Sequence, residues 1–355
     1  MKNKFNYNWV LKDTVFTKDK GTVFSCFACG GGSTMGYKLA GFDVIGHNDI
    51  DKKMIQVYKE NHKPKFSFLE SITTFAKRKD LPMELYNLDI LDGSPPCSSF
   101  SMAGNREKDW GKEKVFREGQ ADQVLDTLFF DFIDLAKELQ PKVVVAENVK
   151  GLLMGEAKSY VRKIYKEFDK AGYYCQHFLL DSSKMGVPQR RERVFFICLR
   201  KDLAKPFLHY ADMFTEIPKI EMFFNEKEIQ FSETFHDYTD RPLSAHYLKF
   251  WNLRMPGDLD FSYASERMGK NKNAQFQYKF LRMNKVANTI IAGEQCVLYD
   301  YPRYRNFDEL CENGSYPKDY NFLKLKTEYL IGMSVPPVMT AQIASNIYEQ
   351  WFSKI

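Results

Sequence analysis

The sequence predicts an α/β protein whose mostly parallel sheet is covered by helices on both faces, together with a second, smaller domain. Over the first two hundred residues, short apolar runs alternate with segments of helical periodicity, which is typical of such a sheet. After Arg200 this alternation stops, and residues 203–286 show no clear period. We therefore expect residues 1–202 and 287–355 to form the main domain and residues 203–286 to form the smaller one.

The elements of the main domain follow from the same periodicity. Apolar runs predict the strands, which we expect at residues 23–27, 44–47, 88–91, 143–146, 174–180 and 194–199. Helical spacing predicts the helices, which we expect at residues 51–61, 122–139, 158–171 and 339–352. Pro141 and Gly172 stand where two of these helices would end, and the last helix is expected to return to the main sheet.

The composition indicates a soluble globular protein of the cytoplasm. Of the 355 residues, 44% are hydrophobic and 27% are charged, so the chain can bury a full core. The first residues lack the apolar core of a signal peptide, and no run approaches about 18 apolar residues, so we expect no membrane segment. Seven scattered cysteines indicate free thiols. Cys26 and Cys29 have metal-type spacing, but no second Cys or His pair stands near, so we expect no metal site.

Charge is distributed unevenly along the expected small domain. Residues 203–240 contain three Lys or Arg against eight Asp or Glu, whereas residues 241–285 contain nine against three. Aromatic residues are interleaved with this basic block. The block is consistent with a solvated face over an aromatic core, and also with a surface that binds nucleic acid.

A cysteine is displayed in the stretch G-S-P-P-C-S-S-F-S, residues 93–101, directly after a predicted strand. Gly93 permits a sharp turn and two prolines fix the backbone ahead of Cys97, so the thiol is presented rigidly. This stretch alone fits a reactive thiol and an ordinary loop cysteine equally well. The polar segment that follows, residues 102–120, has the position of a lid over such a group.

Residues 23–51 predict a strand, a Gly-rich turn, a helix, a second strand and an acid. Glycines at 30, 31 and 32 let the backbone approach a ligand at the start of a helix, and the acid can accept hydrogen bonds from ribose hydroxyls. The pattern fits a cofactor that carries a nucleoside. It does not separate a dinucleotide from S-adenosylmethionine, and a purely structural glycine turn remains an alternative.

Two further motifs stand at predicted strand ends. Glu147 lies at the carboxyl end of a buried strand, where open parallel sheets bind ligands, and it suits either a proton donor or a helix cap. Gln189, Arg191 and Arg193 alternate at the start of another strand and therefore face one side. Two guanidinium groups there fit an anion or base-carbonyl site, and equally an ordinary surface.

Taken together, these motifs resemble the (cytosine-5) DNA methyltransferases over nearly the whole chain. In chain order they are the Gly-rich turn, P-P-C, E-N-V, Q-x-R-x-R and a C-terminal G-x-S-V-P-P. The resemblance implies the Rossmann-like fold of methyltransferases that use S-adenosylmethionine, with residues 203–286 as the target-recognition domain. In that setting the basic, aromatic block is expected to bind DNA.

The resemblance also implies a role for each motif residue. Cys97 would add to carbon 6 of cytosine, Glu147 would protonate ring nitrogen 3, Arg193 would bind the base carbonyl oxygen, and Arg191 would orient the base and the thiol. The residues expected to bind the cofactor are Phe27, Gly30, Gly31, Gly32, Asp49, Ile50, Ser71, Pro96 and Ser334. Those expected to contact DNA are Ser101, Gln189, Thr289 and Arg303.

Four residues depart from the family pattern, all on the cofactor side. Ser25 stands where an Asp is common, and Cys29 replaces a Gly of the turn. Ser71 takes the place of the acid that usually recognises the adenine amine, and Met333 replaces an Asn before Ser334. These departures bear on cofactor contacts and leave the expected reaction type unchanged.

The expected activity is transfer of a methyl group from S-adenosylmethionine to carbon 5 of a flipped-out cytosine in a specific duplex DNA sequence. We expect a monomer that acts on double-stranded DNA, and the sequence leaves open whether a cognate restriction endonuclease is its functional partner. Two alternatives remain: methylation of cytosine in RNA, such as tRNA, by the same fold, and a DNA-binding regulator with weakened catalysis. Intact Cys97, Glu147, Arg191 and Arg193 speak against the regulator.

Overall fold

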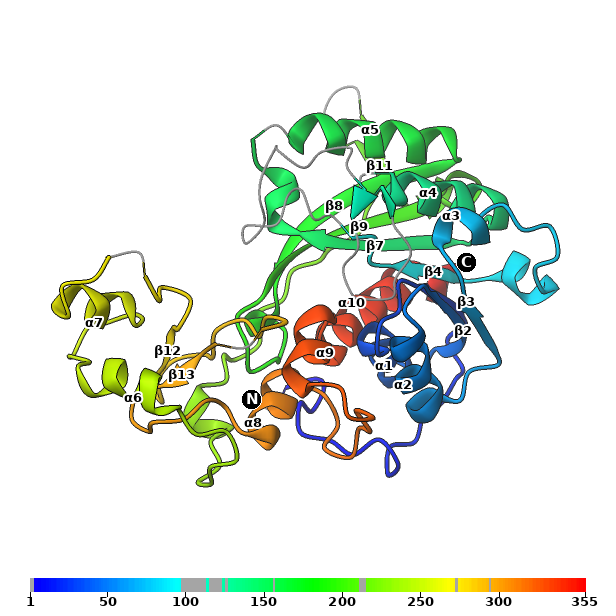
Figure 1. Ribbon diagram of the computed structural model, residues 1–355. Coiled ribbons are helices and arrows are strands. Elements are labelled where there is room, and N and C mark those ends of the chain that lie inside the picture. Colours follow the sequence, from blue (N-terminus) through cyan, green and yellow to red (C-terminus); the bar gives the residue numbers. More distant parts are fainter. Residues whose placement is uncertain are drawn as a thin grey trace. The chain divides into compact units, whose positions relative to one another are not determined.

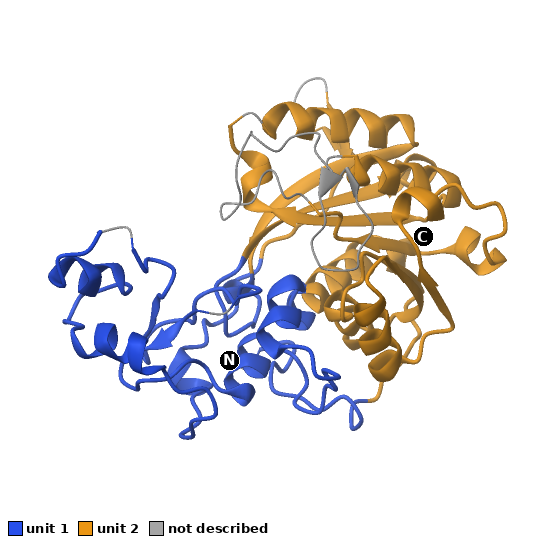
Figure 2. Cartoon of the chain, viewed as in Figure 1, with its two compact units in different colours: residues 1–14, 182–191, 224–339 blue, residues 15–181, 192–223, 340–355 orange. Residues whose placement is uncertain are grey.

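The protein is described by a computed structural model that covers residues 3–96, 113–114, 123–124, 127–155, 157–210, 215–271, 274–293 and 295–355. The chain divides into two compact units (Figure 2). Unit 1 comprises Met1–Thr14, Ser182–Arg191 and Phe224–Met339. Unit 2 comprises Val15–Asp181, Glu192–Phe223 and Thr340–Ile355.

Unit 2 is built on one seven-stranded sheet with the strand order β3-β2-β1-β4-β7-β9-β8 (Figure 1). The strands are β1 (Thr22–Cys26), β2 (Asp43–Asp49), β3 (Phe66–Leu69), β4 (Ile90–Gly93), β7 (Val143–Val149), β8 (Tyr173–Asp181) and β9 (Glu192–Arg200). Neighbours from β3 to β7 pair in parallel, whereas β9 runs antiparallel to both β7 and β8. The predicted mostly parallel α/β sheet is confirmed, and each predicted strand overlaps an observed one.

The antiparallel strand follows from the connection that precedes it. β8 and β9 pair from Tyr173 opposite Arg200 to Asp181 opposite Glu192, so the chain reverses direction over residues 182–191. The central residues of β9 are fully buried because strands flank it on both sides. Of the seven strands in this sheet, only β3, a short half-buried strand, has no counterpart among the predicted strands.

Helices cover both faces of this sheet (Figure 1). On one face lie α3 (Ile72–Phe75), α4 (Leu128–Leu139) and α5 (Ala157–Lys170), whose apolar side chains pack into the main core with those of the strands. On the other face lie α1 (Gly32–Leu39), α2 (Lys52–His62) and α10 (Pro337–Gln350), of which residues 340–350 belong to unit 2. The helices predicted at 51–61, 158–171 and 339–352 are confirmed.

The helix predicted at 122–139 begins later than expected. The observed helix α4 starts at Leu128, and residues 123–124 instead form β6 (Gln123–Val124), which pairs antiparallel with β5 (Glu113–Lys114). Val124 satisfies the helical spacing of apolar residues, but its backbone is used by the strand pair. A second small pair in unit 2 joins β10 (Leu208–Tyr210) to β11 (Glu216–Pro218).

Unit 1 is assembled from short elements around aromatic clusters. Its elements are α6 (Ala245–Asn252), α7 (Ser262–Arg267), β12 (Phe280–Leu281), β13 (Val297–Leu298), α8 (Phe307–Asn313) and α9 (Thr327–Met333). Phe250 stacks on Phe261 with ring centroids 5.8 Å apart, and Phe261 stacks on Tyr278 at 5.5 Å. The aromatic residues of the basic block therefore supply the core of this part of the chain.

The compact units differ from the domain boundaries expected from periodicity. Residues 203–223 belong to unit 2, where the Trp351 indole donates to the Lys219 carbonyl (2.9 Å) and the Gln350 amide donates to the Glu221 carbonyl (2.9 Å). Unit 1 gains the N-terminal segment, whose Trp9 indole donates to the Ser315 carbonyl at 2.9 Å. Long-range hydrogen bonds of this kind leave no trace in local periodicity. Among the described helices, none has the length and apolar composition needed to cross a membrane.

Candidate active site

Most of the expected site residues of unit 2 meet at one edge of its sheet. The Gly-rich turn follows β1, Asp49 ends β2, and Pro96 comes shortly after β4. Glu147 lies near the end of β7, and Arg193 lies at the start of antiparallel β9, opposite Val149. Because the parallel strands end at the same edge and antiparallel β9 begins there, the fold brings motifs that are far apart in sequence to one place.

The Gly-rich turn holds a strained backbone. Phe27 (φ 53°) and Cys29 (φ 50°) adopt the left-handed conformation, which non-glycine residues rarely occupy, and Gly31 (φ 84°) does so as well. A Cβ atom at Gly31 would overlap the His62 imidazole, so only glycine fits there. The Gly31 N–H donates to the Ala28 carbonyl at 2.8 Å, which closes the turn. Strain of this kind is typical of a loop shaped for a ligand.

Asp49 joins this turn to the end of β2. One carboxylate oxygen accepts from the Cys29 N–H (2.8 Å) and the other from the Asp51 N–H (2.8 Å). Burial raises the pKa of Asp49 to about 6, although these backbone hydrogen bonds oppose the shift. Each oxygen keeps a lone pair, so the side chain can also accept hydrogen bonds from ribose hydroxyls.

A second buried carboxylate, Asp92, was not singled out from the sequence. Its side chain on β4 is 4% exposed. One oxygen accepts from the Ser25 hydroxyl (2.7 Å) and the Ser33 hydroxyl (2.8 Å), and the other accepts from the Tyr37 hydroxyl (3.2 Å). Burial raises the pKa of Asp92 to about 6. The available signal was an acid inside an apolar strand run, immediately before Gly93.

The remaining residues expected to bind the cofactor lie in different settings. Ile50 is half-buried next to Asp49. The Ser71 hydroxyl caps α3 by accepting from the Thr74 N–H at 3.2 Å. Ser334 lies in unit 1, where its buried hydroxyl donates to the Leu330 carbonyl at 2.9 Å. The Ser71 and Ser334 hydroxyls thus each make a local hydrogen bond.

Glu147 and Arg193 form an ion pair at the sheet edge. The Arg193 Nε lies 2.9 Å from Glu147 Oε1, and the two side chains are 17% and 13% exposed. Beside them the Asn148 amide donates to the Pro95 carbonyl at 3.2 Å and ties the segment after β4 to β7. Pro96, which is half-buried, is the last residue of that segment within the described ranges. Cys97 and Ser101 lie outside the described residues, as does most of the expected lid at 102–120.

Arg191 and Gln189 lie in unit 1, and their side chains make hydrogen bonds to other residues of that unit. The Arg191 side chain is buried, and its terminal nitrogens donate to the carbonyls of Ile290 (3.1 Å) and Gly332 (2.9 Å). The buried Gln189 amide donates to the Asn313 carbonyl (2.9 Å) and accepts from the Ile290 N–H (2.7 Å). These contacts fasten residues 182–191 to the rest of unit 1.

The two other residues expected to contact DNA also have partners within unit 1. The Thr289 hydroxyl donates to the Arg190 carbonyl at 2.5 Å. Arg303 is 2% exposed, and both terminal nitrogens of its guanidinium lie 2.8 Å from the Glu309 carboxylate. This buried bidentate pair stabilises unit 1. Contact between Arg303 and DNA would require the pair to break.

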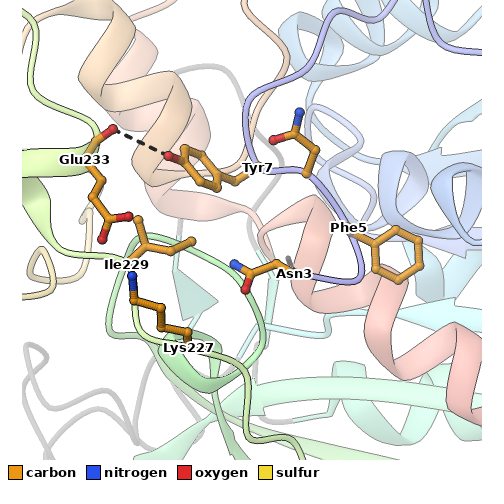
Figure 3. A pocket seen from close by; sticks show the side chains of 7 residues that line it. Asn3, Phe5, Tyr7, Lys227, Ile229 and Glu233 are labelled. Carbon is orange, nitrogen blue, oxygen red and sulfur yellow. Dashed lines mark hydrogen bonds between the residues drawn. The ribbon is translucent and has the colours of Figure 1, made fainter. Parts of the chain in front are cut away.

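A cavity of about 260 Å³ lies in unit 1, away from the predicted site residues in sequence. Its lining consists of Asn3, Phe5, Asn6, Tyr7, Lys227, Ile229 and Glu233 (Figure 3). The Tyr7 hydroxyl donates to the Glu233 carbonyl across it at 3.5 Å.

Within the described ranges, no group of three or more His, Cys, Asp or Glu side chains is placed to hold a metal ion.

Curated proteins with similar sequences are type II methyltransferases by name. The type II methyltransferase M.FnuDI of Fusobacterium nucleatum is 36% identical over 181 residues, which cover 51% of this chain and 47% of that protein. The type II methyltransferase M.NgoPII of Neisseria gonorrhoeae is 35% identical over 185 residues, which cover 52% and 50%. The chain thus spans about half the length of each of these relatives.

Solved structures with the same fold extend over nearly the whole chain. A variant of Spodoptera frugiperda DNMT2 superposes with a TM-score of 0.61 at 17% identity and covers 94% of this chain and 99% of that one. The Dnmt2 methyltransferase of S. pombe gives a TM-score of 0.61 at 14% identity, with 93% and 98% covered. The family model for C-5 cytosine-specific DNA methylases matches residues 21–349, and the chain therefore belongs to that family.

Proposed function

We propose that this protein transfers a methyl group from S-adenosylmethionine to carbon 5 of cytosine in a specific sequence of duplex DNA. The observation that carries the proposal is the Glu147–Arg193 ion pair, which lies at the same sheet edge as the Gly-rich turn and Asp49. An acid and a guanidinium held together can meet ring nitrogen 3 and the carbonyl oxygen of one cytosine.

The residues of the turn fit S-adenosylmethionine. Asp49 would offer a half-buried carboxylate to the ribose hydroxyls, and Phe27 and Ile50 would offer half-buried apolar surface to the adenine ring. The strained turn before α1 leaves room for the backbone to approach the methionine portion. When bound, this cofactor supplies an electrophilic sulfonium methyl group.

The protein groups would then act on the base. The Cys97 thiol would lose its proton to solvent, and the Glu147 carboxylate would take up a proton from solvent. The thiolate would then form a bond to carbon 6 while Glu147 passes that proton to ring nitrogen 3, and Arg193 would hold the carbonyl oxygen. Carbon 5 becomes nucleophilic and takes the methyl group. Loss of the carbon 5 proton to water, departure of the thiolate from carbon 6 and return of the nitrogen 3 proton to Glu147 would restore the neutral aromatic ring. Since a paired base cannot reach such a site, the cytosine must leave the duplex at a cost of a few kcal/mol.

Arg191 would contribute indirectly in this scheme. Its guanidinium donates to two carbonyls of unit 1, and the chain continues from it to Glu192 and Arg193 of β9. It would thus anchor the segment that presents Arg193.

The basic residues of 241–285 support DNA as the substrate. We further propose that the protein acts as a monomer in the cytoplasm, with a restriction endonuclease as its functional counterpart.

Expression in cells followed by bisulfite sequencing of their DNA tests the activity and its target together. Methylated cytosines in one recurring sequence are expected with the natural protein and none with Cys97→Ser, because serine is a far weaker nucleophile. Full methylation by Cys97→Ser would overturn the covalent mechanism. Methyl transfer by the purified protein to tRNA but not to duplex DNA would instead favour the RNA substrate.

A further inference from the structure

We propose that Asp92 is a positioning residue that holds the cofactor turn and the strand leading to Cys97 in one fixed arrangement. This inference rests on the proposed function. It assigns to the buried carboxylate of β4 the task of fixing the chain before and after the Gly-rich turn.

The register of the sheet places residues 25 and 92 side by side, so a carboxylate could stand at either position. β1 and β4 are parallel neighbours, and Ser25 lies directly opposite Asp92. A carboxylate on either residue therefore occupies the same space between the two strands. In this chain the pair consists of one acid and one alcohol, and the Ser25 hydroxyl donates to the Asp92 carboxylate at 2.7 Å.

Asp92 accepts hydrogen bonds from residues on both sides of the Gly-rich turn. Ser25 precedes the turn and Ser33 follows it in the first residues of α1, and both hydroxyls donate to the same carboxylate oxygen, at 2.7 and 2.8 Å. The other oxygen accepts from Tyr37, one helical turn further along α1. Because Phe27 and Cys29 between these anchors have left-handed backbones, the turn needs such fixed ends to keep its shape.

The same residue leads directly to the nucleophile. Asp92 is followed by Gly93, where a Cβ atom would meet the Phe132 ring at 2.5 Å, and then by the prolines ahead of Cys97. On the neighbouring strand β7, the Asn148 amide donates a hydrogen bond to the Pro95 carbonyl. A continuous chain of contacts therefore runs from the turn through Asp92 and Pro95 to the strand that carries Glu147.

The charge on Asp92 is poorly suited to stabilising the fold. Burial raises its pKa to about 6, and the Glu147 carboxylate on β7 adds to this effect. Within the part of the chain that the structure describes, the other titratable groups facing it are Cys26 on β1, Tyr37 on α1 and Tyr58 on α2, and none of them carries a positive charge. A buried acid without a cation costs stability at neutral pH, so its presence here indicates a functional demand.

Asp89 provides a matched control on the same strand pair. It precedes β4 at the opposite end and also bridges to β1, since its carboxylate accepts from the Thr22 N–H at 2.7 Å. Unlike Asp92, it has a cation, Lys142, at 2.7 Å. A purely structural role for an acid between β1 and β4 would make the two positions behave alike.

The first experiment compares Asp92→Asn with Asp89→Asn in the purified full-length protein. Titration calorimetry with S-adenosylmethionine, without DNA, measures cofactor binding, and thermal unfolding at pH 8 measures stability. For Asp92→Asn we expect a dissociation constant raised by about tenfold or more, because a charged hydrogen-bond acceptor is lost, with an unfolding midpoint that stays the same or rises. For Asp89→Asn we expect the reverse: a lower midpoint and unchanged cofactor binding.

The second experiment relocates the charge. Asp92→Ser should bind S-adenosylmethionine weakly, and adding Ser25→Asp should restore most of the affinity because the carboxylate returns to the same space from β1. Unchanged binding by Asp92→Asn, or a folded double variant that binds no better than Asp92→Ser, would overturn the inference. Failure of the natural protein to bind S-adenosylmethionine at all would overturn the proposed function instead.

Discussion

At the scale of single residues, the Glu147–Arg193 pair is the most informative feature of the site. The two side chains are mostly buried and 2.9 Å apart, so each is oriented before any base arrives. Preorganised groups of this kind lose little freedom when the substrate binds. Removing one partner leaves the other charge poorly compensated, at a cost of about 3–5 kcal/mol for a fully buried pair and less for this partly exposed one.

Removing the proton donor should therefore reduce the chemical step. We expect Glu147→Gln to lower kcat for methyl transfer to unmethylated genomic DNA by about hundredfold or more, since a general acid contributes that much. Incorporation of a radioactive methyl group measures this rate. The matched control is Glu192→Gln, which breaks an exposed ion pair with Lys150 (2.9 Å) close to Arg193 in sequence. Its kcat should be unchanged, and equal losses in both variants would argue against the role of Glu147.

At the scale of elements, the Gly-rich turn and α1 form a unit that the local sequence largely specifies. The short β1, the glycines and the following helix all appear where the pattern predicts them. What the pattern does not contain is the environment of each glycine. Gly31 is confined by His62 as well as by its left-handed backbone, whereas Gly155 (φ 57°) is also left-handed but has nothing within 4 Å.

Alanine substitutions at these two glycines should separate the two effects. Both substitutions cost about 1 kcal/mol of stability, because a non-glycine residue must adopt the left-handed conformation. Only Gly31→Ala must also displace His62 and so distort the turn. We expect Gly31→Ala to bind S-adenosylmethionine more weakly in titration calorimetry and to lose more unfolding stability. Gly155→Ala should bind it normally. Normal cofactor binding by Gly31→Ala would show that the turn does not hold the cofactor.

At the scale of the whole molecule, the basic block of residues 241–285 divides into two kinds of cation. The arginines are used internally: Arg254 stacks 3.2 Å above the Trp251 ring, and Arg241 pairs with Glu328 at 3.0 Å. Lysines at 249, 270, 279 and 285 are exposed. Among the described cations of this block, we therefore expect the exposed lysines to contact DNA phosphates, whereas the arginines stabilise unit 1.

Reversing the charge of exposed lysines tests this assignment. We expect a Lys249→Glu, Lys279→Glu and Lys285→Glu triple variant to bind duplex DNA more weakly, and the slope of log affinity against log salt to fall by about one for each lost phosphate contact. Lys166→Glu on α5 is an exposed control and should leave the slope unchanged. A triple variant with the natural salt slope would place the DNA surface elsewhere.

The sequence by itself determined the mostly parallel sheet, the order of its motifs and the position of Phe27, Asp49 and Glu147 at strand ends. Local periodicity and strand direction are enough for that, because parallel strands must end at a common edge. Tertiary structure decided which polar groups are available. Antiparallel β9 brings Arg193 to Glu147, Arg191 donates to a carbonyl 99 residues away, and Asp92 meets Ser25 of the neighbouring strand. Partners so distant in sequence are set by packing, which no local pattern records.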